Sequence, residues 1–76
     1  MDWRERIVVD PKILVGKPLV RGTRLSVEFI VGLFAQGWTA QQVLENYPGL
    51  TLDDVHACFG YANDVLQSER LYLVGT

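Results

Sequence analysis

Apolar and polar positions follow two different patterns along the chain, and the change falls near Ser26. Before it, short apolar runs are separated by glycine and proline; these runs are Ile7-Val8-Val9, Ile13-Leu14-Val15 and Leu19-Val20. Short runs of β-branched and aliphatic residues between turn residues indicate strands. Strands this short do not form a sheet that is stable alone, so we expect them to pair with a second copy or to pack against helices.

After Ser26 the apolar positions recur with the period of a helix, and their spacing predicts three helices. The first is capped by Ser26 and ends at Gly37, a residue type that favours helix C-termini. The second covers residues 39–46 and the third residues 51–67, with a turn containing proline and glycine at residues 47–50. A short helix, a tight turn and a longer helix describe a helix-turn-helix, although a packing hairpin in a three-helix core has the same parts.

The second and third helices both begin with a capping box, in the patterns Thr39-x-x-Gln42 and Thr51-x-x-Asp54. The apolar stripe of the third helix consists of Val55, Phe59, Ala62 and Leu66. This stripe predicts that Phe59 lies at the centre of the buried face. Gly60 is unfavourable inside a helix, by roughly 1 kcal/mol relative to alanine.

A further apolar run, Leu71-Tyr72-Leu73-Val74, follows the third predicted helix. It is strand-like in composition and finds no evident partner in the helical part of the chain. We therefore expect Leu71, Tyr72, Leu73 and Val74 to form an interface, either with a second copy or with a partner protein.

Together these elements predict a mostly α fold, with a small three-helix core preceded by short N-terminal β segments. We expect one domain over residues 1–76, because a chain of 76 residues is too short for more. Its parts are short strands and basic turns at 1–25, three helices with the helix-turn-helix at 26–67, and a strand-like tail at 68–76.

Composition narrows the possible means of stabilisation and the location. Cys58 is the only cysteine and His56 the only histidine, which excludes an internal disulfide and a four-ligand zinc site. We therefore expect no cofactor, and a homodimer as the means by which so small a core is stabilised. The charged N-terminus lacks the features of a signal peptide, and no apolar run is long enough to cross a bilayer, so a cytoplasmic protein without a membrane partner is predicted.

The net charge is -2, but the charged residues are unevenly distributed along the chain. Six of the seven basic residues lie in the first 24 positions. Lys17, Arg21 and Arg24 stand beside glycines there, and we expect them to provide the phosphate contacts if nucleic acid is bound. The third helix offers Asp53, Asp54 and His56 at its start, a poor set for reading DNA bases. A solvated basic face, with the glycines serving turns, is the alternative interpretation.

Enzyme chemistry has little support in this sequence. His56 and Cys58 are two residues apart on a predicted helix and therefore point to different faces, so they do not form a catalytic pair. Asp53 and Asp54 are typical of helix capping and of the first turn of a helix. We predict that the protein is not an enzyme, with no catalytic and no metal-ligating residues.

One long segment resembles the signature of a prokaryotic family catalogued as domain of unknown function 433. It reads Asp10-Pro11-Lys12-Ile13-Leu14-Val15-Gly16-Lys17-Pro18-Leu19-Val20-Arg21-Gly22-Thr23-Arg24. Later pieces are similar too: Val27 to Ile30, Gly37-Trp38-Thr39, Val43-Leu44, Tyr47-Pro48-Gly49-Leu50-Thr51, Asp54-Val55 with Ala57, and Tyr61-Ala62. The positions that carry over as family features are Lys17, Arg21, Gly22, Thr23 and Arg24. Gly16, Gly22 and Thr23 are the residues expected at the turns of this motif.

The resemblance implies a homeodomain-like helix-turn-helix fold and an antitoxin of a type II toxin–antitoxin pair. Such a chain neutralises a PIN-like ribonuclease toxin and binds operator DNA to regulate its own operon. This sequence departs from the family pattern at His56, where a basic residue is expected early in the third helix, and the departure weakens the case for DNA binding. The alternative function is a helix-turn-helix DNA-binding transcriptional repressor without a toxin partner.

Overall fold

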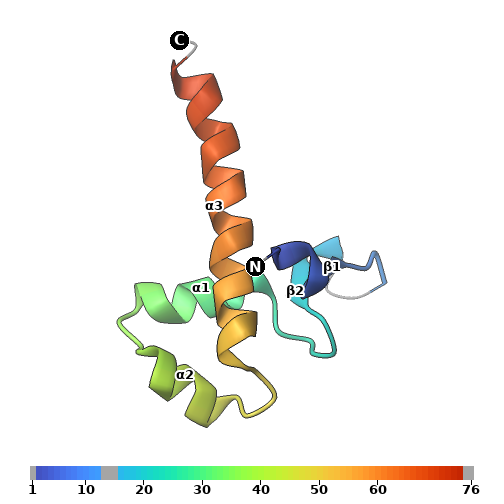
Figure 1. The fold of residues 1–76 in the computed structure, drawn as a ribbon, viewed down its shortest axis with the longest axis vertical. Coiled ribbons are helices and arrows are strands. Elements are labelled where there is room, and N and C mark those ends of the chain that lie inside the picture. The colour runs from blue at the N-terminus through green and yellow to red at the C-terminus, as the bar shows by residue number, and fades with distance from the viewer. Residues whose placement is uncertain (1, 13–15, 75–76) are drawn as a thin grey trace.

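The structure is a computed structural model that describes residues 2–12 and 16–74, with side chains as far as residue 68. Its elements in chain order are a 3-10 helix η1 (Trp3–Glu5), strands β1 (Ile7–Val9) and β2 (Pro18–Val20), and helices α1 (Val27–Ala35), α2 (Ala40–Asn46) and α3 (Leu52–Val74). Figure 1 shows η1 and the two strands on one side of the lower half of the long helix α3, with α1 and α2 toward the other side. The predicted strand Ile13-Leu14-Val15 lies outside the described residues.

The two N-terminal strands pair with each other in the same chain. β1 and β2 are antiparallel, with Ile7 opposite Val20 and Val9 opposite Pro18. Ile7, Leu19 and Val20 are buried, and the strands contact α1 and α3. Packing against the helices therefore supplies the support that two strands of three residues lack on their own.

Local capping fixes where each helix begins, as the sequence predicts. The Ser26 hydroxyl accepts a hydrogen bond from the Phe29 amide at the start of α1, and the Thr39 capping box opens α2. At the start of α3, Thr51 and Asp54 form the predicted reciprocal pair, at 2.9 and 3.2 Å. Gly37 ends α1 with a φ of 98°, which is in the left-handed region that favours glycine.

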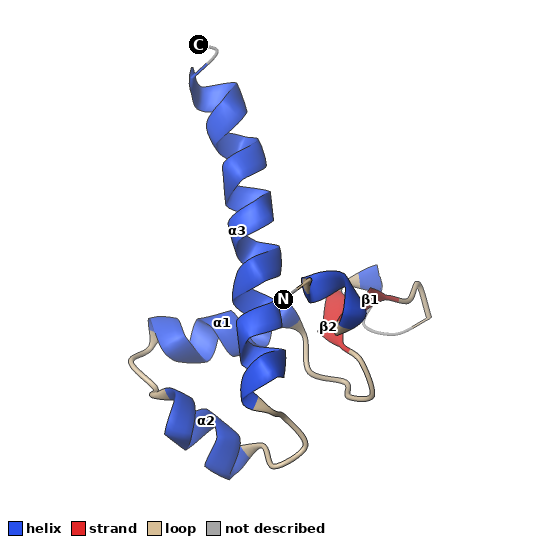
Figure 2. Ribbon diagram, in the orientation of Figure 1, coloured by secondary structure: helices blue, strands red, loops and turns tan. Residues whose placement is uncertain are grey.

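The core lies where α1, α2, α3 and the strand pair meet. Its fully buried side chains include Ile30 of α1, Val43 of α2, Cys58 of α3 and Val20 of β2. The fold class predicted from the sequence is confirmed: three helices, preceded by a short two-stranded sheet, form a mostly α fold (Figure 2). α2, the turn after it and α3 form the helix-turn-helix.

The buried face of α3 differs from the predicted stripe. Asp54, Val55 and Cys58 face the core, whereas Phe59 is 40% exposed and packs edge-to-face on Phe34 with ring centroids 5.1 Å apart. Each residue turns a helix by about 100°, so a face centred between positions 54 and 58 places position 59 at its edge. The prediction that Phe59 occupies the centre was therefore wrong.

The predicted strand-like tail is also wrong as far as the structure describes it, because α3 continues to Val74. Residues 71–74 are helical, and α3 therefore ends seven residues later than the predicted end at position 67. An isolated strand would leave its backbone amides without partners, whereas a continued helix bonds each amide to the carbonyl four residues earlier. The C-terminal half of α3 extends away from the rest of the chain (Figure 1). No helix among the described residues combines the length and apolar character needed to cross a membrane.

Trp3 anchors the N-terminal segment on the middle of α3. Its indole Nε1 donates a hydrogen bond to Asp64 at 2.6 Å, and its ring packs edge-to-face on Tyr61 with centroids 5.0 Å apart. The same ring lies against Gly60. This contact fixes where Tyr61 stands, and Tyr61 forms one wall of the groove described next.

Candidate partner-binding site

The Arg21-Gly22-Thr23-Arg24 motif forms the turn that leads from β2 into α1. Gly22 has a φ of 80°, and the Thr23 hydroxyl donates to the Val20 carbonyl at 2.8 Å and accepts from the Leu25 amide at 3.0 Å. The Val20 amide donates to the Leu25 carbonyl at 3.0 Å and closes the turn. Gly16, two residues before the start of β2, also has a positive φ, of 78°. These glycines and Thr23 therefore shape the backbone on both sides of β2.

The three basic residues of this motif do not form one cluster. Lys17 and Arg21 flank β2 at opposite ends, about 13 Å apart at roughly 3.3 Å per residue of strand. Lys17 Nζ is 2.9 Å from a carboxylate oxygen of Glu28, and Arg21 Nε donates to the Glu5 carbonyl at 3.0 Å. Arg24 is exposed. Since Lys17 is paired with an acid, a joint phosphate site of all three residues has little geometric support.

The start of α3 is acidic but partly neutralised by a residue from the N-terminus. The Arg6 guanidinium lies 3.1 Å from Asp54 and 3.4 Å from Asp53. Asp54 is only 8% exposed and also caps the helix, so the pair joins the strand region to α3. His56, two residues after Asp54 on the same helix, is exposed. This arrangement holds the fold together and presents no basic surface to a DNA groove.

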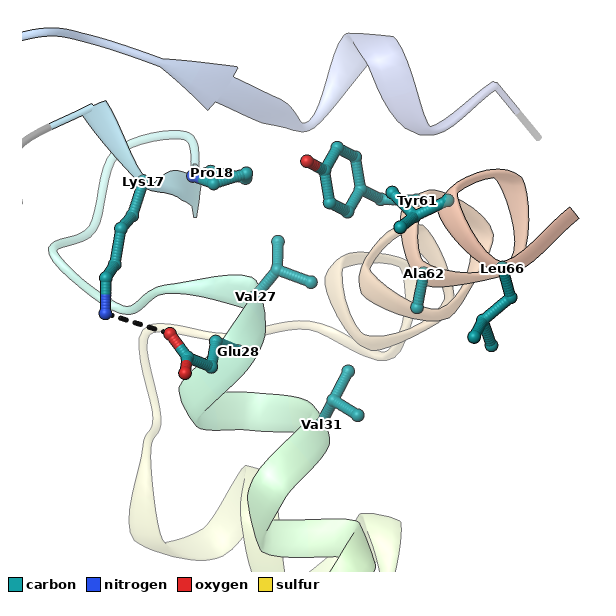
Figure 3. A pocket seen from close by; sticks show the side chains of 9 residues that line it. Lys17, Pro18, Val27, Glu28, Val31, Tyr61, Ala62 and Leu66 are labelled. Atoms are coloured by element: carbon teal, nitrogen blue, oxygen red, sulfur yellow. Dashed lines mark hydrogen bonds and ion pairs between the residues drawn. The ribbon is translucent and has the colours of Figure 1, made fainter. Parts of the chain in front are cut away.

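An open apolar groove lies where α1, the start of β2 and the middle of α3 meet. Its volume is about 380 Å³. The residues that line it are Lys17, Pro18, Val27, Glu28, Val31, Tyr61, Ala62, Val65 and Leu66. Figure 3 shows the side chains of Val27 and Val31 from α1 facing those of Ala62 and Leu66 from α3. The Lys17–Glu28 ion pair stands at its rim (Figure 3).

The groove opens onto the part of α3 that leaves the body of the molecule. Leu66 is 62% exposed and Val65 is 40% exposed, although both are large and apolar. Exposed apolar surface next to a groove is typical of a site where another chain binds. Apart from Lys17 and Glu28, which pair at the rim, and Tyr61, the lining side chains are aliphatic, so the groove is suited to apolar contact.

Cys58 and His56 do not form a catalytic or metal-binding pair. Cys58 is fully buried, and burial, assisted by the charge of Asp54, raises the pKa of its thiol to about 12. A protonated, buried thiol is neither a nucleophile nor a metal ligand. Among the described residues, no three side chains of His, Cys, Asp or Glu are grouped so that they could hold a metal ion.

Sequence reasoning missed this groove, because its walls come from three separate segments. Ala62 and Leu66 were assigned to a buried stripe, and Pro18 and Val27 to separate elements. The side chains of Leu71, Tyr72, Leu73 and Val74 lie outside what the structure describes, so their predicted role as an interface stays a prediction. The available signal was the apolar stripe of the third predicted helix, which continues as far as Leu66.

Comparisons with known proteins place the chain among uncharacterised relatives. A family model described as protein of unknown function (DUF433) matches residues 7–62. The uncharacterized protein y4eO of Sinorhizobium fredii is 36% identical over 59 residues, which are 78% of this chain and 27% of y4eO. An uncharacterized protein of Archaeoglobus fulgidus is 58% identical over 24 residues, which are 32% of this chain and 67% of that protein. The chain thus spans only about a quarter of the length of y4eO.

A solved structure shares the fold. The crystal structure of a DUF433 member protein from Anabaena variabilis is similar with a TM-score of 0.77 and 29% sequence identity. The similarity covers 91% of this chain and 68% of that one.

Proposed function

We propose that this chain, which belongs to the DUF433 family of proteins of unknown function, is an antitoxin-type interaction module that neutralises a PIN-like ribonuclease toxin. The observation that carries the proposal is the apolar groove, which continues onto exposed Val65 and Leu66 of the projecting helix α3. A groove of this kind is suited to an apolar segment or helix of a partner protein. The exposed Leu66 side chain is a suitable anchor for such contact.

The charge distribution of this chain fits a partner protein that binds RNA. Residues 25–76 carry six acidic residues against Arg70 as the only basic one. A ribonuclease needs basic surface to bind phosphates, and complementary charge on its inhibitor speeds their encounter. The acid excess of the helical part therefore favours a nucleic-acid-binding protein over nucleic acid itself as the partner.

Regulation of its own operon is the second part of the proposal, and it depends on Arg21 and Arg24. Both are exposed at the turn after β2, while Asp53 and Asp54 occupy the start of α3. If operator DNA binds, Arg21→Ala with Arg24→Ala lowers the log–log salt slope by about 2, or roughly 1 for each lost phosphate contact. If the chain instead read DNA bases through α3, His56→Ala would change its preference among DNA sequences. We do not expect such a change.

Co-expression tests the neutralisation directly. The adjacent reading frame is expressed alone and together with this chain, and growth and RNA integrity are measured. We expect growth arrest from the nuclease alone, rescue by this chain, and loss of rescue with Leu66→Glu. The matched control Asn63→Glu adds the same charge on an exposed position outside the groove and keeps rescue. Unimpaired rescue by Leu66→Glu, or no rescue by the parent chain, contradicts the proposal.

A further inference from the structure

Residues 2–4, which are the start of η1 and its cap, form a strap that the side chain of Trp3 attaches to α3. The Trp3 indole donates to Asp64 at 2.6 Å and packs edge-to-face on Tyr61. η1 has no buried residue, and the hydrogen bond to Asp64 is exposed. Contacts that are few and exposed open locally at a lower free-energy cost than global unfolding. The strap can therefore leave α3 while the core stays folded.

The chain is fixed again directly after the strap. The Arg6 guanidinium pairs with Asp54 at 3.1 Å, and the Arg6 carbonyl accepts a hydrogen bond from the Arg21 amide at 2.7 Å. Arg21 Nε also donates to the Glu5 carbonyl at 3.0 Å. These contacts hold the segment after the strap to both α3 and the end of β2. A movement of the strap is therefore confined to residues 2–4, with its pivot at Glu5.

Tyr61 belongs both to the strap contact and to the groove. Its ring meets the ring of Trp3 at an interplanar angle of 89°, with centroids 5.0 Å apart, and it also lines the groove. Figure 3 shows Tyr61 reaching from α3 toward Pro18 and Val27. When the strap leaves, the Tyr61 ring loses this aromatic partner and moves more freely among its rotamers. The position of this wall of the groove therefore depends on the strap.

From these shared contacts we propose that the strap is a conformational switch for the groove. With the strap attached, Tyr61 is held as a wall and the groove is complete. With the strap detached, Tyr61 is released and the groove loses that wall. A partner that contacts the wall binds the attached state more tightly, and by linkage it holds the strap on α3 to the same extent. The role of the switch in toxin binding rests on the proposed function, whereas the coupling of strap and groove does not.

Tryptophan fluorescence tests whether the strap detaches on its own. The chain has two tryptophans, so Trp38→Phe leaves Trp3 as the only one. We expect the Trp3 emission to shift to longer wavelength at a lower urea concentration than the loss of helix measured by circular dichroism. The matched variant Trp3→Phe leaves Trp38, which packs against the core, and its emission should change together with the helix signal. Coincident transitions of Trp3 emission and helix content overturn the proposal.

Methyl NMR of the free chain tests the coupling through Tyr61. Trp3→Ala removes the strap contact, so the methyl resonances of Val27 and Val31 in the groove should shift as the Tyr61 ring moves relative to them. Val43 is fully buried on α2 and outside the groove, and its resonances should stay in place. In a Tyr61→Leu background, Trp3→Ala should shift the groove methyls by less than half as much. Groove methyls that do not respond to Trp3→Ala, or that respond equally in both backgrounds, overturn the proposal.

Titration with the protein encoded by the adjacent reading frame separates this inference from the proposed function. If that protein binds the parent chain, Trp3→Ala should weaken the binding roughly 2- to 10-fold, the range that corresponds to one edge-to-face aromatic contact. Equal affinity for the parent chain and Trp3→Ala overturns the switch. Absence of binding to the parent chain contradicts the proposed function alone, because the two measurements on the free chain decide whether the strap detaches and whether it controls the groove.

Discussion

The indole ring of Trp3 lies against Gly60, so closely that an alanine methyl group at position 60 would stand 3.3 Å from Trp3 Cδ1 and 3.4 Å from Trp3 Cβ. This contact explains a glycine in the middle of a long helix. The N-terminal segment approaches α3 at the one turn where the helix has no side chain, and Trp3 then bonds Asp64 one turn further along. The approach also positions Tyr61 at the wall of the groove.

The first prediction concerns this contact. Gly60→Ala alone should stabilise the protein by less than the roughly 1 kcal/mol that helix propensity offers, because the methyl group presses on Trp3. With Trp3→Ala already present, the same change should yield the full gain. Urea unfolding of the four variants in a double-mutant cycle measures the coupling, expected at about 0.5 kcal/mol or more. An equal gain in both backgrounds would show that the contact carries no energy.

The second prediction ranks two large apolar residues by their burial. Ile30 is fully buried, and Ile30→Ala should cost about 2–5 kcal/mol of unfolding free energy. Phe59 is 40% exposed, and Phe59→Ala should cost less than the about 3–5 kcal/mol typical of a buried phenylalanine. Chemical denaturation of both variants gives the comparison. A larger loss for Phe59→Ala than for Ile30→Ala would place Phe59 in the core after all.

The third prediction compares the contributions of two neighbouring aspartates, Asp53 and Asp54, to stability. Asp54→Ala removes a helix cap, worth about 0.5–2 kcal/mol, and leaves Arg6 without its nearer partner. Asp53→Ala removes only a more exposed contact at 3.4 Å, worth at most about 1 kcal/mol. Thermal unfolding should therefore show the larger loss for Asp54→Ala. Equal losses would mean that the capping box does not contribute.

The fourth prediction follows from the buried thiol. Burial raises the pKa of Cys58 from 9.0 to about 12, so the folded chain retains a proton that the unfolded chain loses between these values. The contribution of this group to stability is therefore complete below pH 9 and declines as pH rises toward 12. The stability difference between the parent chain and Cys58→Ala should narrow over that interval. A difference that stays constant with pH would contradict the raised pKa.

Local signals in the sequence predicted the helices well, and contacts between distant segments account for most of the errors. The caps at Ser26, Thr39 and Thr51 involve groups three residues apart, so the sequence around each one suffices to predict it. The rotation of α3 that leaves Phe59 at the edge involves Asp54, whose partner Arg6 is 48 residues away.

The C-terminal run and the groove show two further limits of sequence reasoning. Four consecutive apolar residues at 71–74 fit a strand or a helix, because a run this short has no distinguishing period. The groove joins Pro18, Val27 and Ala62, which no local pattern connects. The ion pair between Lys17 and Glu28, 2.9 Å apart, likewise joins positions that no local pattern connects. The phosphate contacts of Lys17 stay a prediction.

Calorimetric titration with the protein encoded by the adjacent reading frame tests most directly whether the groove and the projecting part of α3 bind a partner protein. The parent chain and Asn63→Glu should bind with equal affinity. Leu66→Glu should bind at least about tenfold more weakly, since loss of one buried leucine contact is worth roughly 1.5–3 kcal/mol. Equal affinity for Leu66→Glu and Asn63→Glu would place the binding surface elsewhere and contradict the account.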